Sequence, residues 1–278
     1  MRTGSDVSPA LLAALRRERL DSVEGAFAYG GGDDLVKPGL GHRRRTRLTL
    51  TDAAGGRHEL YLKRYHREAL PARLRRWWTY GIRTSPAEVE FDNIEAIRAA
   101  GVGTMQAVAC GSEWGTLDAR RSYLLVTAVP GRKLDDIVWN FVELNADRPE
   151  GMWTFTLSLA AAVRRFHEAG FVHRDMYACH VFLDESSGAM QWRLIDVARV
   201  FAPRWRRVRW RVKDLAQLVY SMPRSRWTEP YWPGFLRAYL GDADERTARR
   251  WDRLVQRKVA AMRRRNWRKQ NAQGQPSK

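Results

Sequence analysis

Residues 171–184 read FVHRDMYACHVFLD, and this stretch decides the fold. His173, Arg174 and Asp175 lie in a row between apolar segments. A second histidine, His180, follows five residues after the aspartate. Charged groups between segments that are expected to be buried cost free energy unless they are paired or used. The stretch is therefore either a satisfied polar cluster at a turn or a catalytic loop, and the elements around it distinguish the two.

The segments on either side of this loop have recognisable periodicity. MWTFTLSLAAAVRRFHEAG at 152–170 predicts a strongly apolar helix that stops at Gly170. VFLDESSGAMQWRLID at 181–196 predicts a short β-hairpin with its turn at Ser187-Gly188. The order of apolar helix, charged loop, hairpin and aspartate resembles the C-lobe of the protein kinase-like fold.

The first half of the chain is predicted to be rich in strands. Alternation of apolar and polar residues predicts strands at 46–52, 58–65, 105–110 and 122–130. The AAGG turn joins the first two into a hairpin. Helices are predicted at 8–20, with Ser8 as N-cap and Pro9 at the first position, and at 86–100.

Helices at about 212–222 and 245–270 complete a second half that is mainly helical. The sequence therefore predicts an α+β chain with a two-lobed protein kinase-like fold, a β-rich N-lobe, a mainly α-helical C-lobe and a hinge near 127–131. The expected domains are an N-terminal helical extension (1–26), an N-lobe (27–130), a C-lobe (131–245) and a basic C-terminal helix with a tail (246–278).

Phosphoryl transfer from ATP requires a cation on the phosphates, a carboxylate that holds this cation, ligands for Mg²⁺ and a group that positions the acceptor hydroxyl. Lys63, on the predicted strand YLKRY, matches the cation, and Glu90 or Glu88 on the next helix can pair with it. Asp175 matches the positioning carboxylate, and Asp196 in LID matches the metal ligand.

Three features depart from ordinary protein kinases. The asparagine expected five residues after the HRD aspartate is His180, which can ligate a divalent ion but is a poorer Mg²⁺ ligand than an amide oxygen. The DFG motif is replaced by Asp196-Val197-Ala198. The glycine-rich segment contains GLG at 39–41 and not GxGxxG. An ordinary protein kinase is therefore not expected.

With these departures, the sequence resembles the bacterial lipopolysaccharide kinase family, the heptose and Kdo kinases of the inner core. HRDMYACHVF, LIDVAR about twenty residues further on and RWRVKDL carry the resemblance. The matching residues are His173, Asp175, Tyr177, Cys179, His180, Asp196, Arg199, Lys213 and Asp214. YLKRY and Glu90-Phe91 match in the N-lobe, which favours Glu90 over Glu88. The resemblance covers about residues 40–222.

The resemblance implies ATP, Mg²⁺ and transfer of phosphate to a sugar hydroxyl of a lipid A–core acceptor at the inner face of the membrane. It assigns catalysis to Asp175, Lys63 and Glu90, nucleotide binding to Lys63, Gly39, Gly41 and Val129, and the metal to Asp196 and His180. It assigns structural roles to His173 and to Asp214, which would hold the backbone of the catalytic loop.

The net charge of +18 predicts anionic partners. RWRRVRWR at 204–211 follows Asp196, where kinases meet their acceptor, and RLRRWW at 73–78 has the same composition. Arginine binds phosphate bidentately and tryptophan stacks on sugar rings. An anionic glycolipid held by Arg204, Arg206, Arg207, Arg209 and Arg211 explains these segments. Nucleic acid would use the same residue types and is disfavoured by the resemblance.

Other interpretations stay open. The acceptor could be a protein or another small molecule, or the chain could be a catalytically silent kinase-fold module that docks on lipid or nucleic acid. The helix at 245–270 could lie on anionic lipid or be an ordinary C-lobe helix. Two cysteines and the lack of a recognisable signal peptide predict a cytoplasmic protein in a reducing compartment, peripheral at the inner face of the membrane.

Overall fold

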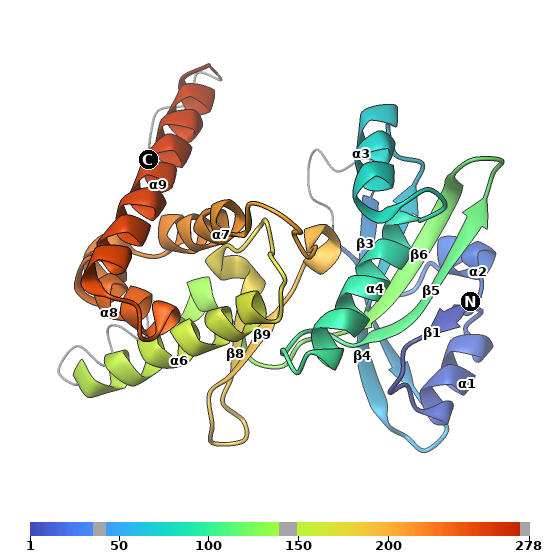
Figure 1. The fold of residues 1–278 in the computed structure, drawn as a ribbon. Coiled ribbons are helices and arrows are strands. Elements are labelled where there is room, and N and C mark those ends of the chain that lie inside the picture. The colour runs from blue at the N-terminus through green and yellow to red at the C-terminus, as the bar shows by residue number, and fades with distance from the viewer. Residues whose placement is uncertain (36–42, 139–148, 273–278) are drawn as a thin grey trace. The chain divides into compact units, whose positions relative to one another are not determined.

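The computed structural model describes residues 1–35, 43–138 and 149–272. The chain forms two compact units, residues 1–129 and residues 130–278. Gly39 and Gly41, which were predicted to bind nucleotide, lie outside the described residues, as does the tail from residue 273. Mixed helix and sheet in this arrangement confirms the predicted α+β class (Figure 1).

The first unit is built on an antiparallel sheet with the strand order β1-β5-β6-β4-β3-β2. Its elements are β1 (Arg2–Thr3), α1 (Pro9–Arg17), α2 (Val23–Ala28), β2 (Asp33–Asp34), β3 (Arg43–Thr51), β4 (Arg57–His66), α3 (Leu70–Tyr80), α4 (Pro86–Ala99), β5 (Ala107–Trp114) and β6 (Ala119–Thr127). Helix α4 lies on one face of the sheet, and α1 and α2 lie on the other (Figure 1).

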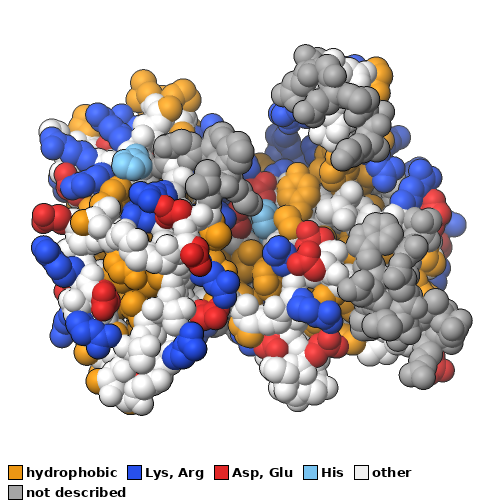
Figure 2. Space-filling model, turned by 180° about the vertical axis from the view of Figure 1, so that it is seen from behind, with side chains coloured by type: hydrophobic (Ala, Val, Ile, Leu, Met, Phe, Trp, Pro, Cys, Tyr) orange, Lys and Arg blue, Asp and Glu red, His pale blue; other side chains and the backbone are white. Residues whose placement is uncertain are grey.

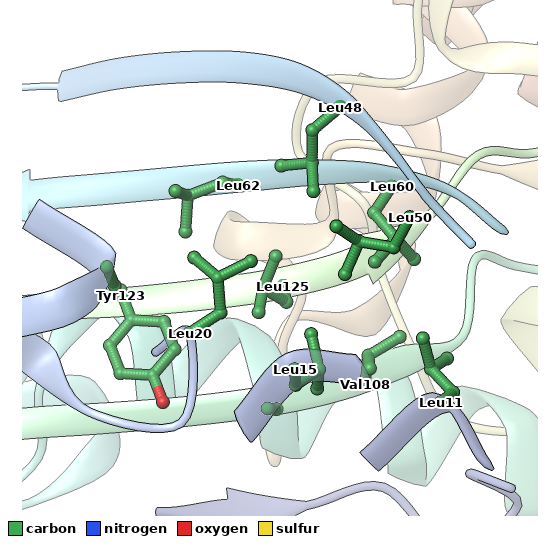
Figure 3. Packing of buried hydrophobic residues seen from close by; sticks show 12 residues of the cluster. Leu11, Leu15, Leu20, Leu48, Leu50, Leu60, Leu62, Val108, Tyr123 and Leu125 are labelled. Carbon is green, nitrogen blue, oxygen red and sulfur yellow. The ribbon is translucent and has the colours of Figure 1, made fainter. Parts of the chain in front are cut away.

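Side chains of β4 alternate between the two faces of the sheet, and the two faces receive different kinds of residue. Leu60 and Leu62 are fully buried among the side chains of α1 and the neighbouring strands, as Figure 3 shows. Lys63 and Tyr65, of opposite parity, point to the face covered by α4. Successive side chains of a strand point to opposite faces, so one strand supplies the core on one side and a charged residue on the other.

Helix α1 belongs to the same core as the sheet. Its Leu11 and Leu15 pack with Leu20, Leu48 and Leu125 (Figure 3). Burying a leucine side chain contributes about 1.5–3 kcal/mol, so these contacts fix the helix on the sheet. The predicted division into a separate extension before residue 27 stays a prediction.

The second unit is mainly helical and carries a small antiparallel sheet in the order β7-β8-β9. Its elements are β7 (Arg132–Lys133), α6 (Pro149–Glu168), η1 (Ala178–His180), β8 (Val181–Asp184), β9 (Gln191–Leu194), η2 (Val197–Arg199), α7 (Arg207–Ser221), η3 (Arg224–Thr228), α8 (Glu229–Leu240) and α9 (Glu245–Ala272). Helix α6 packs on α8, and α7 packs on α9 through buried Val255 and Val259.

The structure adds elements that the sequence analysis did not identify. Helices α3 and α8 were not predicted, and α7 begins at Arg207, about five residues before the predicted start. The basic segment 204–211 therefore includes the first turn of α7, from Arg207 onward. Among the described residues, no helix is long and apolar enough to cross a bilayer.

Candidate active site

The first unit buries an ion pair between the strand lysine and helix α4. Lys63 Nζ donates to Glu90 Oε1 at 2.5 Å, and the Tyr65 hydroxyl donates to Glu90 Oε2 at 2.6 Å. Glu90 is 1% exposed and Lys63 is 7% exposed. Burial, with the charge of Glu90, raises the pKa of Tyr65 well above its usual range, so its hydroxyl remains a donor. The pair holds an ammonium group at a fixed place on the sheet.

Glu88 has another function in the same helix. Its carboxylate accepts from the backbone N–H of Ser85 at 2.9 Å, while the Ser85 hydroxyl accepts from the Glu88 N–H at 3.1 Å. This reciprocal pair is a capping box, which satisfies two backbone donors at the start of a helix. The lysine therefore pairs with Glu90, the carboxylate that the sequence favoured.

Glu90→Gln is expected to lower the free energy of unfolding by about 3 kcal/mol, because it leaves the buried ammonium of Lys63 without a counter-charge. Chemical denaturation of the full chain measures this change. Glu88→Gln is the matched control, and it should cost less than about 1 kcal/mol because glutamine also completes a capping box. Equal losses in the two variants would contradict a special role for the Lys63–Glu90 pair.

In the second unit, a buried carboxylate of α7 holds the backbone of the HRD loop. Asp214 is fully buried and accepts from the N–H groups of His173 at 2.6 Å and Arg174 at 2.7 Å. His167 Nε2 lies 3.3 Å from the same carboxylate. Hydrogen bonds to a charged acceptor are among the stronger ones in proteins. The loop is thus fixed through hydrogen bonds to its main chain.

Arg174 has a strained backbone at the centre of this loop. Its φ of 70° lies in the left-handed region, which a residue with a side chain adopts at a cost of about 1–3 kcal/mol. Lys213 Nζ donates to the carbonyl oxygen of Arg174. The guanidinium of Arg174 lies over the rings of Phe201 and Trp210. Burial lowers the pKa of Lys213 to about 8. These contacts of its backbone and its side chain maintain the strained conformation.

Asp175 follows Arg174 and its carboxylate is partly open to solvent. Arg199 Nη1 lies 2.9 Å from Asp175 Oδ1 and 2.7 Å from Oδ2. The Asp175 side chain is 23% exposed and that of Arg199 is 46% exposed. The guanidinium comes from the turn that follows Asp196. This contact orients the carboxylate.

Asp196 and His180 come together at the end of the small hairpin. His180 Nε2 lies 3.7 Å from Asp196 Oδ2. The backbone of Ile195 links them, because its N–H donates to the carbonyl of His180 and its carbonyl accepts from His173 Nε2 at 3.0 Å. Asp196 has a left-handed backbone with a φ of 59°. Such outliers cluster where the surroundings over-determine a functional side chain.

The hydrogen bonds of His180 define what its ring can do. Its Nδ1 lies 2.7 Å from the carbonyl oxygen of Asp175, so Nδ1 carries a proton and Nε2 faces Asp196. Burial works to lower the pKa of His180, but hydrogen bonds to Cys179 and Asp175 and the charge of Asp196 outweigh it and raise the pKa to about 9. The protonated ring thus pairs with Asp196, and a divalent cation would have to replace one proton.

The residues present fit a divalent cation only in part. The Asp196 carboxylate is the hard oxygen ligand that Mg²⁺ prefers, and the imidazole of His180 is a softer one. No group of three or more His, Cys, Asp or Glu side chains converges in the described parts of the chain. A cation held there would need further oxygen ligands, such as the phosphates of a nucleotide.

Comparison with known proteins agrees with this geometry. The model of the lipopolysaccharide kinase (Kdo/WaaP) family matches residues 40–239. The chain belongs to this family. A solved structure described as WaaP in complex with acyl carrier protein is similar at 25% sequence identity and a TM-score of 0.64, over 94% of this chain and 99% of that one. A search of curated proteins found no match.

Membership of the lipopolysaccharide kinase family confirms the family resemblance seen in the HRD, LIDVAR and KDL motifs, and the WaaP neighbour confirms the kinase-like fold.

Val129, predicted to bind nucleotide, is half-buried at the end of the first unit, two residues after β6. His173 is fully buried, and burial lowers its pKa, so it is a neutral packing residue of the loop.

The arginines of the basic segments have different surroundings. Arg204, Arg206 and Arg209 are exposed. Arg207 donates to the carbonyl of Pro203 at 3.2 Å, and Arg211 donates to the carbonyl of His167 at 2.6 Å. These two arginines stabilise their own unit through at least one bond each.

Two arginines of the segment 73–78, which was predicted to bind the acceptor, are instead paired with acidic residues of their own unit. Arg73 and Arg76 both pair with buried Asp118, at 2.5 Å and 2.8 Å, and Arg76 also pairs with Glu68. Their charges are neutralised inside the first unit, so these two arginines anchor α3. Composition alone could not separate buried arginines from exposed ones.

The sequence analysis missed the residues that complete the Asp214 network. His167 links Asp214 to the hydroxyl of Tyr239, which lies 2.8 Å from His167 Nδ1. Gln217 and Ser221, on the same face of α7 as Asp214, accept from the backbone N–H groups of Met176 and Ala178. The spacing of these three α7 residues, three or four positions apart, was the only available signal.

Proposed function

We propose that this lipopolysaccharide kinase transfers the γ-phosphate of ATP to a hydroxyl of heptose or Kdo in the inner core. The observation that carries the proposal is the accessible Asp175 carboxylate on a loop held through its backbone by buried Asp214. Family membership supports a sugar acceptor in lipopolysaccharide. Positioning and electrostatic stabilisation are the main contributions that a protein makes to phosphoryl transfer, and a fixed carboxylate supplies the positioning of the hydroxyl.

Each residue has a distinct role in the proposed reaction. Asp175 orients the acceptor hydroxyl and accepts its proton, and Arg199 holds the carboxylate in place. Lys63, held by Glu90, neutralises charge on the ATP phosphates. Asp196, with His180, would hold Mg²⁺. When bound, Mg²⁺ screens the charge that develops on the transferred phosphoryl group.

The proposed acceptor-binding segment runs into the start of α7. Exposed Arg204, Arg206 and Arg209 offer bidentate donors to phosphate or carboxylate groups, and Trp205, at 83% exposed, offers a flat apolar face to a sugar ring. Arg207 is also exposed, while Arg211 is half-buried and makes the smaller contribution. An anionic core oligosaccharide complements this surface better than a neutral small molecule.

The test is transfer of labelled phosphate from ATP to dephosphorylated lipopolysaccharide core by the purified full chain with Mg²⁺. We expect core-dependent transfer in the wild type and none with Asp175→Ala, and mass spectrometry of the product identifies the hydroxyl. Transfer to a protein but not to the core would favour a different acceptor. ATP binding without turnover on any acceptor, equal in both proteins, would support a silent docking module.

Two kinds of partner follow from the proposal. The principal partner is the lipopolysaccharide core, a glycolipid that requires the enzyme to work at the cytoplasmic face of the inner membrane. The WaaP neighbour was solved with acyl carrier protein, and we propose a similar protein partner here, favoured by the net charge of +18 if that partner is acidic.

A further inference from the structure

Helix α3 exposes three of its large apolar side chains, while its Arg76 is buried and its Arg73 is largely covered. Leu70 is 58% exposed, Leu74 is 51% exposed and Trp78 is 93% exposed. These three residues are four positions apart, so they form one stripe along the helix. Ile82, 71% exposed, follows just after the helix end. A tryptophan that is almost fully exposed is uncommon unless it contacts a partner.

The opposite face of α3 is polar and fixed. Arg76 is 7% exposed and pairs with Glu68 and Asp118, and Arg73 pairs with the same Asp118. A helix of a globular protein normally turns its apolar stripe toward the core. Here the ion pairs attach the helix to the unit, so its apolar stripe is not needed for folding and is available for binding.

Basic residues surround the apolar stripe. Arg67, Arg75 and Arg83 are exposed close to it in sequence. The segment 69–87 contains no Asp or Glu, and Glu68, just before it, is already paired with Arg76. Figure 2 shows hydrophobic side chains uncovered at the end of the first unit where α3 lies, with Lys and Arg side chains around them. Leucine and tryptophan beside arginine, without acidic residues, is the composition of helices that lie in the interface of anionic membranes.

We propose that α3, with Ile82, is a membrane-docking helix that inserts its Leu70–Leu74–Trp78 stripe into the interface of an anionic lipid bilayer. The proposal rests on the proposed function in one respect, because an acceptor embedded in a membrane gives the enzyme a reason to bind there. Docking through a helix fixed by buried ion pairs would hold the enzyme on the bilayer without any membrane-spanning segment.

The charge around the stripe favours lipid over a second copy of the chain. A two-fold dimer through this face would bring Arg67, Arg75 and Arg83 toward the same residues of the second copy, with no acidic group in the segment 69–87 to balance them. An anionic bilayer offers both an apolar interior for the stripe and negative charge for its borders.

The experiment measures binding of the full chain to two kinds of vesicle by co-sedimentation. One contains phosphatidylcholine alone, and the other contains equal parts of phosphatidylcholine and phosphatidylglycerol. We expect binding to the anionic vesicle at least tenfold tighter than to the neutral one. The double variant Leu74→Ser, Trp78→Ser should lose at least tenfold of this affinity, because each side chain removed takes a large apolar area from the bilayer contact.

Two matched variants separate α3 from other exposed apolar residues. Leu117→Ser changes a leucine of the same unit that is 66% exposed, and Trp267→Ser changes a tryptophan of α9 that is 59% exposed. Both should bind vesicles like the wild type. Loss of binding with Trp267→Ser but not with the α3 variant would overturn the proposal in favour of α9. Equal binding by all variants, or no preference for anionic vesicles, would overturn it too.

Two further measurements keep the outcome clear. All the substituted side chains are exposed, so unchanged denaturation midpoints would show that the variants fold. Transfer to a core oligosaccharide freed of its lipid should be equal in the α3 variant and the wild type. If neither protein transfers phosphate to any acceptor, the proposed function fails while vesicle binding still decides the role of α3. A dimer in sedimentation velocity that the α3 variant abolishes would show the stripe covered by a second copy, against this proposal.

Discussion

Asp175→Asn is expected to lower the rate constant of phosphoryl transfer by about 10²–10⁴-fold, the usual contribution of a positioned acid–base group. Asparagine keeps the shape of the side chain and one oxygen for Arg199, but it cannot accept the proton of the acceptor hydroxyl. The affinity for ATP should change little, because the role proposed for Asp175 is to contact the acceptor hydroxyl and not the nucleotide. Single-turnover transfer of labelled phosphate measures the rate constant separately from binding.

Asp184→Asn is the control for this variant. Asp184 lies at the end of β8 in the same unit and accepts from the backbone N–H of Ser186 at 3.1 Å. It should retain transfer within a few-fold of the wild type. The ion pair of Asp175 with Arg199 is partly exposed, so its loss should cost at most about 1 kcal/mol of stability. A rate within tenfold of wild type for Asp175→Asn would exclude this carboxylate as the essential positioning group.

Several elements of the first unit were predictable from the sequence because their signals are local. Ser8 caps α1 by accepting from the Leu11 N–H at 3.2 Å, as predicted, and the predicted hairpin of 46–52 and 58–65 is found as β3 and β4. The predicted helix at 86–100 is found as α4, and it begins at the Ser85 cap that precedes Pro86. Turn glycines, caps and alternation are short-range features, and each of these elements contains one.

Helix α3 was not predicted, because prediction assumes that the apolar face of a helix is turned toward the core, and α3 turns its apolar residues to solvent. Its leucines and its Trp78 occur at helical spacing, but they face solvent, while Arg76 is buried. A sequence pattern identifies the apolar face of a helix and does not say whether the core covers it. The deciding group is Asp118, which lies 42 residues from Arg76 in the chain, and no local signal connects the two.

The same limit applies to the catalytic loop. HRD and the two aspartates are visible as a motif, and the assignment of Asp214 to the loop backbone agrees with its hydrogen bonds to His173 and Arg174. The contact of Arg199 Nη1 with both carboxylate oxygens of Asp175 was not foreseen, because Arg199 comes from the turn after Asp196, whose backbone is left-handed. Motifs thus identify the groups that act, and the fold determines which groups orient them.

Asp214→Ala is expected to lower both stability and activity, unlike Asp175→Asn. Its carboxylate is fully buried and accepts two backbone N–H groups, so its removal leaves two buried donors unpaired. Each unpaired buried donor costs about 1–3 kcal/mol, so the two together give a loss of about 2–6 kcal/mol in the free energy of unfolding. The left-handed conformation of Arg174 also loses one of the contacts that maintain it.

The effect on activity follows from the position of the loop. Once the N–H groups of His173 and Arg174 are unpaired, the Arg174 backbone is no longer constrained, and the next residue is Asp175. Misplacement of a positioning group by about 1 Å can cost about 10²-fold in rate. Denaturant unfolding and transfer assays at a temperature where the variant is folded measure the two effects separately.

Asp252→Ala provides the comparison, because Asp252 also lies in the second unit and accepts from Trp232 Nε1 at 2.8 Å, between α9 and α8. Its loss should cost about 1 kcal/mol and leave transfer unchanged, since this bond is only part-buried and supports no catalytic residue. If Asp214→Ala behaved like Asp252→Ala, the loop would be held by its other contacts, the Lys213 bond to the Arg174 carbonyl above all. A large loss of both properties with Asp214→Ala alone would mean that one buried carboxylate couples the folding of this unit to the position of Asp175.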